Sequence, residues 1–478
     1  MSQYKTSAKD KVPIGQKAAF GAGHFVLNLL PGTLGVFLQV FIITGFGVNP
    51  FLASLLGGLP RIFDALTDPV MGFISDNTKS KWGRRRPYIF GGAIFSGILF
   101  MLMWQLDENA SQTFNFWYVM ILQIIFLIGN TMFATPLVGL GYEMTSDYNE
   151  RTRLMAFSNT MGQIAWMIVP WLYVIIPDTD IFSSQAEGVR QMAIVVGLMC
   201  MVFGVLPAIF CKGIDASNME NRKEINLKTL SSNMKDLWVS IKQVSKNKPF
   251  MKLCGATFLV FNGFQMVAAF SVFIIVFYMY NGSWEEAGTW PAWFNTFNAI
   301  ATAFLVIPII SKMADKLGKR NAFIISTFIS IIGYIMKWWA FDASNPYLMF
   351  IPIPFMAFGL GGLFTLMMSM TADVCDLDEL ENGMPRKEGQ FGAIYWWMVK
   401  LGQALAIILG GLVLDFVGFK EGEGVVQTAE TMQQIRIADI VFPAITAALA
   451  IWVMWKYSLN EERAREIKRE LVERRGEL

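Results

Sequence analysis

The chain has 478 residues, of which 54% are hydrophobic and only 16% are charged. Average soluble domains carry about 25% charged residues, so this composition excludes an ordinary soluble domain and favours a membrane-embedded chain. The formal net charge of +2 gives no basis for nucleic-acid binding. The four cysteines form no CxxC pair, which argues against a disulfide framework and against a zinc site.

Apolar runs long enough to cross a bilayer recur along the chain. A hydrocarbon core of about 30 Å needs about 20 apolar residues per helix. The first run follows a polar, basic N-terminal segment, which predicts a retained helix and not a cleaved signal peptide. We predict twelve spans, over residues 17–46, 50–75, 87–105, 115–141, 154–177, 189–211, 250–281, 286–313, 321–341, 347–371, 390–418 and 435–457.

Lysine and arginine residues in the short connections predict how the chain is oriented. They gather in the N-terminal segment and in the connections after the second, fourth, eighth and tenth spans. The connections 106–114, 178–188 and 342–346 are nearly free of them. Since short cytoplasmic loops are enriched in Lys and Arg, we expect both termini to face the cytoplasm.

The longest interruption, a polar stretch over 212–249, divides the spans into six plus six. A weak echo supports a repeat, because GFISDNTKSKWGRRRPYIF follows the second span and SKMADKLGKRNAFII follows the eighth. This loop pattern is similar to that of the major facilitator superfamily. We therefore predict an all-α integral membrane protein of two six-helix bundles, over 1–211 and 250–457. Residues 458–478 are predicted to form a charged, solvated cytoplasmic helix.

Three charges interrupt the second span, in RIFDALTDPVMGF. An ionised side chain at the bilayer centre costs at least about 2.5–3.5 kcal/mol and is therefore a functional candidate. Arg61, Asp64 and Asp68 are spaced by three and four residues, which places them on one helical face. The two carboxylates lie about 6 Å apart along the axis and require a positive partner.

A proton or a sodium ion at Asp64 and Asp68 meets that requirement, with the Thr67 hydroxyl as a further oxygen ligand. Arg61 balances only part of the negative charge. The alternative is a static network of the arginine and the aspartates that orients the helix.

A lysine in the eleventh span, in IYWWMVKLGQALAI, is a second anomaly. Lys400 is placed to pair with the surplus carboxylate or to hydrogen-bond a polar substrate. Trp396 and Trp397, next to Tyr395, are candidates for stacking on a sugar ring, although membrane tryptophans are often structural.

Two other titratable residues fall inside predicted spans. Lys337 lies near the outer end of the ninth span, where its long stem is expected to snorkel to the interface without a functional role. His24 is the only histidine and lies in the first span. A lone buried histidine is more often a packed residue than a titrating one, and both roles stay open.

Four stretches carry a resemblance to a known family. They are FGAGHFVLNLL, RIFDALTDPVMGFISDNTKSKWGRRRPYI, LGYEMTSDYNERTRL and MTADVCDLDELENGMPRKEGQFGAIYWWMVKLGQALA. Together they resemble the glycoside–pentoside–hexuronide:cation symporters, the melibiose permease family, in the right order along nearly the whole chain.

The resemblance implies roles for individual residues of this chain. Asp64 and Asp68 match the cation-site aspartates of the family, and Thr131 matches a cation-site threonine of the melibiose permease. Thr67 replaces an asparagine that influences cation choice there, so the resemblance does not fix sodium as the coupling ion. Lys400 matches the lysine that links the cation and sugar sites.

The sugar site matches less well. Asn28 takes the place of a sugar-binding aspartate in the first span. Ala134 and Val138 replace a second aspartate and a stacking tryptophan, and Ser158 falls loosely at the position of an arginine. We do not expect a galactoside to bind here as it does in the melibiose permease.

We therefore expect a secondary active transporter that works by alternating access. It would couple Na⁺ or H⁺ to a small polar solute, with a sugar, glycoside or uronate as the leading class. A lysophospholipid or amphiphile carrier and a non-transporting membrane sensor are the alternatives. An enzyme, a cofactor other than the ion and a nucleic-acid partner are not expected. The expected setting is a bacterial cytoplasmic membrane, with a multi-pass monomer surrounded by lipid.

Overall fold

The computed structural model describes residues 11–145, 148–213, 225–382, 388–420 and 425–475. All regular elements within these ranges are helices. The all-helical membrane class predicted from the sequence is thereby confirmed. Some of the basic residues used to predict orientation fall in 1–10 and 383–387, outside the described residues.

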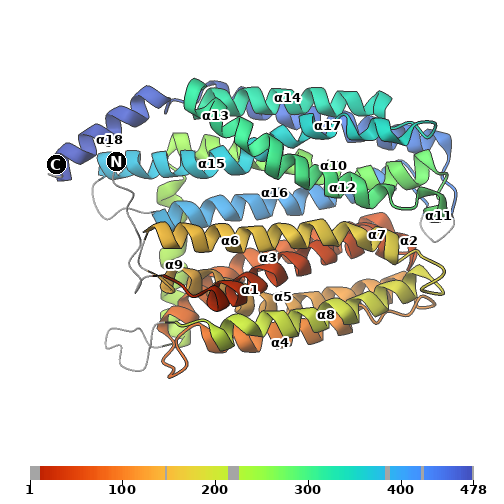
Figure 1. Cartoon of the computed structure of the whole chain (residues 1–478), viewed down its shortest axis with the longest axis horizontal. Coiled ribbons are helices and arrows are strands. Elements are labelled where there is room, and N and C mark those ends of the chain that lie inside the picture. Colours follow the sequence, from red (N-terminus) through yellow and green to blue (C-terminus); the bar gives the residue numbers. More distant parts are fainter. Residues whose placement is uncertain (1–10, 146–147, 214–224, 383–387, 421–424, 476–478) are drawn as a thin grey trace. The chain divides into compact units, whose positions relative to one another are not determined.

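The chain divides into two compact units, with the division between Met234 and Lys235. Within the part of the chain that the structure describes, the first unit holds six helical passes, labelled in Figure 1. They are, in order: α1 (Ile14–Val36) continuing through the π-helix η1 (Phe37–Phe41) and α2 (Ile42–Thr44); α3 (Pro50–Asn77); α4 (Arg86–Met103); α5 (Gln112–Glu143); α6 (Tyr148–Ile168) with η2 (Val169–Trp171) and α7 (Leu172–Ile175); and α8 (Gln185–Phe210).

The second unit holds six further passes and a C-terminal helix. They are: α10 (Lys248–Phe273) with the π-helix η3 (Ile274–Met279); α12 (Trp290–Ile300) with the π-helix η4 (Ala301–Val306) and α13 (Ile307–Leu317), preceded by the short α11 (Trp284–Ala287); α14 (Lys319–Ala340); η5 (Pro346–Phe350) and α15 (Ile353–Asn382); α16 (Glu388–Phe416); α17 (Ala429–Trp455); and α18 (Glu461–Arg475). The polar stretch between the two sets of passes contains α9 (Leu227–Val244).

Several passes begin where the sequence supplies a side-chain cap. The Asn49 side chain accepts a hydrogen bond from the backbone N–H of Phe51 at 2.9 Å, and Pro50 opens α3. The Asn247 side chain does the same for Phe250 at the start of α10, at 3.0 Å. Such caps satisfy backbone donors that have no partner inside the helix.

Ten helices among the described residues are long and apolar enough to cross a membrane. The other two predicted passes, α3 and the run from α6 to α7, are also present as helices. Charge and polarity explain why they fall short of that composition: α3 carries Arg61, Asp64 and Asp68, and α6 opens with the polar sequence YNERTR.

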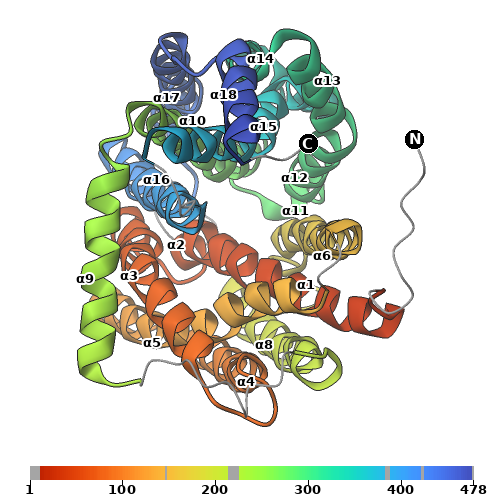
Figure 2. The same cartoon turned by 90° about the vertical axis from the view of Figure 1, so that its left-hand side faces the viewer.

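The two units repeat one packing scheme. In each, the first pass packs on the fifth and sixth, the third packs on the fourth and sixth, and the second packs on the fourth. Figure 2 shows the passes of each unit nearly end-on. The first pass of each unit also contains a π-helical segment, η1 or η3. The six-plus-six division seen in the sequence therefore has a structural counterpart in how each unit packs.

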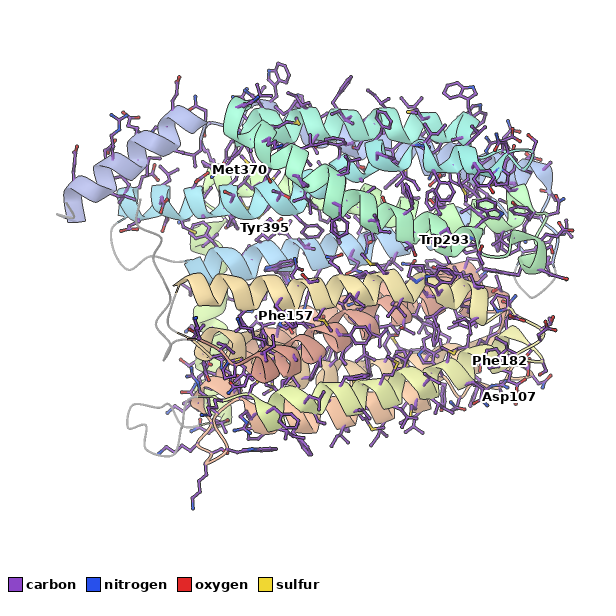
Figure 3. The ribbon with its side chains drawn as sticks, viewed as in Figure 1. Asp107, Phe157, Phe182, Trp293, Met370 and Tyr395 are labelled. Atoms are coloured by element: carbon purple, nitrogen blue, oxygen red, sulfur yellow. The ribbon has the colours of Figure 1, made fainter. Side chains whose placement is uncertain are left out.

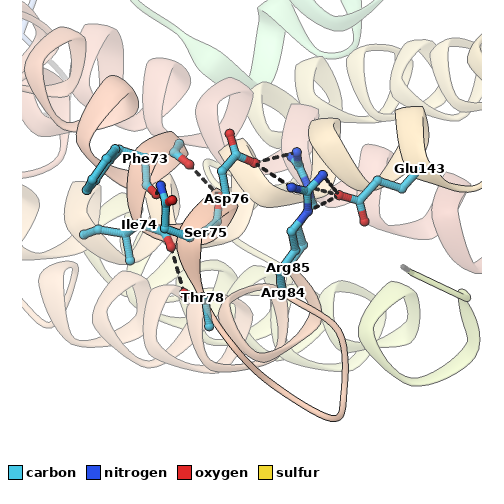
Figure 4. A network of polar contacts seen from close by, with 10 residues as sticks. Phe73, Ile74, Ser75, Asp76, Thr78, Arg84, Arg85 and Glu143 are labelled. Atoms are coloured by element: carbon cyan, nitrogen blue, oxygen red, sulfur yellow. Dashed lines mark hydrogen bonds and ion pairs between the residues drawn. The ribbon is translucent and has the colours of Figure 1, made fainter. Parts of the chain in front are cut away.

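The loop before the third pass is held by ion pairs in the first unit (Figure 4). Arg85 contacts Glu143 at 2.7 Å and Asp76 at 2.7 Å, and Arg84 contacts Glu143 at 2.5 Å. The Arg85 guanidinium lies directly over Gly139 of α5, where any Cβ would collide with it. Gly83 adopts φ +91°, which favours glycine, and lets the chain turn into α4.

The second unit repeats this device with fewer charges. Gly318 adopts φ +77° immediately before α14. Lys319, the first residue of α14, contacts Asp373 of α15 at 2.6 Å. The echo between the two loops in the sequence thus corresponds to the same turn and the same pair of helices in each unit.

Candidate cation and solute sites

The predicted cation-site residues of the first unit meet between α3 and α5. The Thr131 hydroxyl donates to Asp64 Oδ1 at 3.2 Å, and the Thr67 hydroxyl donates to the backbone carbonyl of Asp64 at 3.0 Å. The two hydroxyl oxygens lie 3.1 Å apart. Asp64 and Thr131 are both buried, with exposed fractions of 4% and 2%. The structure therefore brings together three of the four residues predicted to bind the cation.

The hydroxyls of this cluster form a chain of polar contacts. Thr131 donates to the Asp64 carboxylate, and Thr67 can donate either to the Asp64 carbonyl or to Thr131. Both hydroxyl oxygens keep lone pairs, so the cluster could hold a small cation beside the carboxylate.

Asp68 lies one turn further along α3 and contacts a third hydroxyl. The Thr135 hydroxyl donates to Asp68 Oδ1 at 3.4 Å. Arg61 lies on the other side of Asp64 and attracts its carboxylate electrostatically. The site thus offers two carboxylates and three hydroxyls, the hard oxygen ligands that suit a sodium ion.

The candidate solute residue of the first unit, Asn28, is held by two hydrogen bonds. Its amide nitrogen donates to the His24 carbonyl at 2.8 Å, and its oxygen accepts from the Trp166 indole at 3.0 Å. The Trp166 side chain of α6 is 43% exposed. His24 packs edge-on against Phe20 with the ring centroids 4.6 Å apart. An amide beside a half-exposed indole is a surface suited to a polar ring.

The candidate residues of the second unit lie along α16. Trp396 is 45% exposed and stacks on Phe364, with ring centroids 6.3 Å apart. Trp397 and Lys400 are half-buried. Tyr395, labelled in Figure 3, is fully buried in the core of the unit, so in this structure it has no surface to offer a solute. The roles of Trp396, Trp397 and Lys400 stay predictions.

The expectation that Lys337 snorkels to the interface is wrong. Its side chain is 1% exposed and forms an ion pair with Asp439 of α17, which is also 1% exposed. The Lys337 ammonium donates as well to the Ser271 hydroxyl of α10, at 3.2 Å. A partner inside the unit satisfies the charge, so the lysine has no need to reach the membrane surface.

Three contact residues escaped the sequence reasoning. Thr135 follows Thr131 by four residues on α5 and therefore shares its face, a spacing that would have found it. Asp439 interrupts an apolar run, RIADIVF, as clearly as Lys337 does in its own span. Trp166 carried no signal, because its importance comes from a contact with a helix far away in sequence.

These observations define the class of protein. The described residues form long helical passes in two units that repeat one packing scheme, with a carboxylate and hydroxyl cluster inside one unit, which is the architecture of a multi-pass membrane transporter. Residues 19–461 match the family described as MFS/sugar transport protein, where MFS denotes the major facilitator superfamily, and the chain belongs to that family.

Relatives within the family are distant but match over most of their length. A "Glucuronide carrier protein homolog" of Escherichia coli (strain K12) is 24% identical over 433 residues, covering 90% of this chain and 89% of the relative. The "Sodium-dependent lysophosphatidylcholine symporter 1" of Xenopus tropicalis is 23% identical over 499 residues, covering 97% of this chain and 91% of the relative.

Solved structures support the fold. A bacterial homologue of the human lysosomal transporter Spinster, in an inward-facing and unoccupied conformation, superposes with a TM-score of 0.67. It is 16% identical, and the match covers 93% of this chain and 98% of that chain. At this identity the likeness concerns the fold alone.

Proposed function

We propose that this transporter is a symporter that couples Na⁺ or H⁺ to the uptake of a carbohydrate, with sugars, glycosides and uronates as the leading solutes. The observation that carries the proposal is the buried cluster of Asp64, Thr67 and Thr131, in which two hydroxyl oxygens lie 3.1 Å apart beside a carboxylate. Asp68 and Thr135 extend the same oxygen-rich face by one turn. The family description and the glucuronide carrier homologue support a carbohydrate solute.

The coupling follows from charge. Asp64 and Asp68 place two carboxylates within one membrane pass, where charge is costly. A bound cation or proton lowers the net negative charge that the site carries when the protein changes conformation. Coupling requires that the ion favour the solute-loaded state over the empty one, since a ligand shifts a conformational equilibrium only by its differential affinity.

Uptake into energised vesicles tests the proposal. We expect Asp68→Asn and Asp64→Asn to abolish ion-dependent accumulation of solute, because each removes one of the two carboxylates. Asp342→Asn is the matched control, since Asp342 lies in a connection outside the spans and hydrogen-bonds the backbone of Ser344. Unchanged ion dependence in the Asp68→Asn protein would disprove the cation site.

To identify the solute, uptake of labelled glycosides, uronates and lysophospholipids is measured one by one. Each uptake is measured with and without sodium and with and without a pH gradient. A lysophospholipid is the second candidate, because a relative with that name covers nearly the whole chain. Uptake of a lysophospholipid without uptake of any carbohydrate would favour that candidate.

We further propose that the chain is a monomer in a bacterial cytoplasmic membrane with both termini cytoplasmic. The distribution of Lys and Arg among the short connections supports this orientation. A C-terminal fusion to green fluorescent protein should fluoresce, whereas a C-terminal alkaline phosphatase fusion should be inactive.

A further inference from the structure

The fifth pass of the first unit has two exposed faces of different character. On one face of α6, Asn159 is exposed, Gln163 is half-buried and Trp166 is 43% exposed. At about 100° per residue, these three lie within roughly 60° of each other. On the other side of the helix, Ile164 is 38% exposed and Ile168 is 46% exposed. The isoleucine face suits lipid, whereas two carboxamides exposed to hydrocarbon would be costly.

The first pass carries a polar stripe of its own. Four residues on one side of α1 are half-buried and spaced by three and four positions: His24, Asn28, Pro31 and Gly35. Pro31 has no N–H to donate to the Leu27 carbonyl, which adds an acceptor on this side. A Cβ at Gly35 would meet nothing within 4 Å. This side of α1 is therefore polar at Asn28 and open at Gly35.

Another pass of the first unit exposes residues of a different kind. The exposed side chains of α4 include Phe95, Ile98 and Leu102, with exposed fractions of 41%, 42% and 47%. These large apolar residues form the lipid-facing surface expected of a membrane pass. Polar groups inside a membrane pass face the protein interior or a water-filled cavity. The stripes of α1 and α6 thus differ from a lipid-facing surface and suit an aqueous one.

The two stripes meet at Asn28. The Trp166 indole N–H donates to the Asn28 side-chain oxygen at 3.0 Å, and the Asn28 amide nitrogen donates to the His24 carbonyl at 2.8 Å. After these two bonds, the Asn28 carboxamide retains one N–H and one oxygen lone pair for a ligand. The indole is held through its nitrogen while much of its ring stays exposed.

Gly162 makes room for this arrangement. A Cβ at Gly162 would lie 2.6 Å from the Asn28 amide nitrogen. Because that atom is the far end of a side chain, an alanine there would displace the carboxamide and not the backbone. Elsewhere along α1 and α6 the packing is also close, since a Cβ at Gly21 would lie 2.8 Å from Phe157, which is labelled in Figure 3. Gly162 is therefore a positioning residue for Asn28.

We propose that Trp166 and Asn28 bind the ring of a neutral pyranose. The indole stacks on the apolar C–H face of the sugar, and the Asn28 carboxamide hydrogen-bonds its hydroxyls. Among the residues of the two stripes only His24 has a titratable side chain, so this surface recognises hydroxyls and not a carboxylate. The inference rests on the proposed carbohydrate function and assigns the ring-binding surface within it.

Cysteine labelling of full-length protein in lipid nanodiscs tests whether the stripe faces water. Gln163→Cys and Ile164→Cys are adjacent substitutions on the two faces of α6. A charged methanethiosulfonate reagent attacks thiolates, which form in water and not in hydrocarbon, so we expect Gln163→Cys to react at least about tenfold faster. The four native cysteines are buried, and unsubstituted protein labelled in parallel gives the background.

Protection of Gln163→Cys then tests the ring-binding surface. Methyl pyranosides of glucose, galactose and xylose compete with the reagent, with and without sodium and at acidic and neutral pH. We expect at least one of them to slow labelling, whereas the open-chain alditol sorbitol should not. Adding Trp166→Leu should raise the concentration for half-protection roughly tenfold, because the ring face and the hydrogen bond to Asn28 are both lost. Trp166→Phe keeps a ring and should fall between.

Gly162→Ala separates binding from structure. It should weaken protection by the same pyranoside, because the new Cβ displaces the Asn28 carboxamide. The labelling rate of Gln163→Cys without sugar should stay unchanged, which a general disturbance of α6 would not allow. Ile164→Ala, on the apolar face, is the matched control and should leave protection as in the parent.

Four outcomes would overturn the proposal. The first is equal labelling of Gln163→Cys and Ile164→Cys. The second is protection by none of the pyranosides, and the third is full protection in the Trp166→Leu protein. The fourth, protection by lysophosphatidylcholine alone, would overturn the carbohydrate function as well. A failure of ion coupling is detected separately, by uptake in the Asp68→Asn protein, and contradicts the cation site but not this surface.

Discussion

The two units share one packing scheme and place their polar groups in different pairs of helices. In the first unit the second and fourth passes, α3 and α5, meet through Asp64, Thr67 and Thr131. In the second unit the corresponding passes meet through apolar contacts, where Gly361 of α15 packs against Val306 and Ile310.

The third and sixth passes show the opposite arrangement. In the first unit, Gly97 of α4 and Gly197 of α8 allow the two backbones to approach closely. In the second unit, α14 and α17 are joined by the buried ion pair of Lys337 and Asp439. Small residues and polar pairs are both recognised ways to join helices in a bilayer. The same packing scheme therefore accepts either small residues or an ion pair at the junction of the third and sixth passes. A charged residue at that junction has a local role and is not required by the fold.

The largest expected effect on stability comes from the second unit. Lys337→Met leaves Asp439 buried without its charge partner, which costs about 3–5 kcal/mol. We expect a large drop in the thermal unfolding midpoint, measured in detergent by tryptophan fluorescence. The double variant Lys337→Met, Asp439→Leu should recover most of it, because both charges are removed together.

Lys312→Met is the matched control, since Lys312 is exposed and lies in the neighbouring pass. A double variant no more stable than the single one would show that the ion pair is required for more than neutralising charge.

The next largest effect is expected from a substitution at the junction of α4 and α8, the third and sixth passes of the first unit. In Gly97→Ala the new Cβ would lie 2.7 Å from the Gly197 carbonyl oxygen, so α4 and α8 must separate. Such overpacking costs about 1–3 kcal/mol. Gly91→Ala in the same helix meets nothing within 4 Å and should be neutral or slightly stabilising. Equal unfolding midpoints for the two variants would contradict the close approach.

A smaller effect is expected from removing the ion pairs that precede the third pass, and its cost in unfolding free energy differs between the two units. Glu143 is 5% exposed in its side chain and accepts from two arginines, so Glu143→Gln should cost about 1.5–3 kcal/mol. The Lys319–Asp373 pair is 36% and 18% exposed, and Asp373→Asn should cost about 1 kcal/mol or less. Unfolding midpoints in the reverse order would mean that the first unit does not depend on its arginine cluster.

The smallest effect concerns the residue that follows the sixth pass in each unit. Cys211 follows α8, and burial raises the pKa of its thiol to about 12. Because the thiolate is the reactive form, maleimide labelling of Cys211 should keep rising about tenfold per pH unit from pH 7 to 10.

Lys456 takes the corresponding place after α17 and is exposed. A cysteine at Lys456→Cys should react faster at pH 7 and level off above about pH 9, as an ordinary thiol does. Subtracting the labelling of a Cys211→Ser protein isolates the native residue. A plateau for Cys211 near pH 9 would contradict its burial.

Much of the fold could be predicted because a bilayer leaves the chain few choices. Every backbone polar group must be satisfied within the segment that crosses, so long apolar runs become helices. The twelve predicted ranges all contain helices; the second begins at Pro50 as predicted, after the Asn49 cap, whereas the tenth extends to Asn382, well beyond its predicted end at 371. The charges of α3 stood out for the same reason, because a charged side chain within a bilayer is costly and is therefore a functional candidate.

The contacts between helices could not be predicted to the same extent. Lys337 was assigned to the interface, because its stem is long enough to reach it, and only α17 supplied the carboxylate that keeps it inside. Tyr395 stood beside two tryptophans in the sequence, yet the helical turn of α16 buries it while Trp396 remains exposed.

The sequence by itself determined the class of this protein and placed Asp64 and Asp68 on one helical face, since hydropathy and helical spacing are local properties of the chain. The tertiary structure alone decided which groups contact the polar residues of the spans: Thr135 for Asp68, Trp166 for Asn28 and Asp439 for Lys337. These partners come from helices distant in sequence. Side-chain packing brings them within hydrogen-bonding distance, and no periodicity along one segment encodes that.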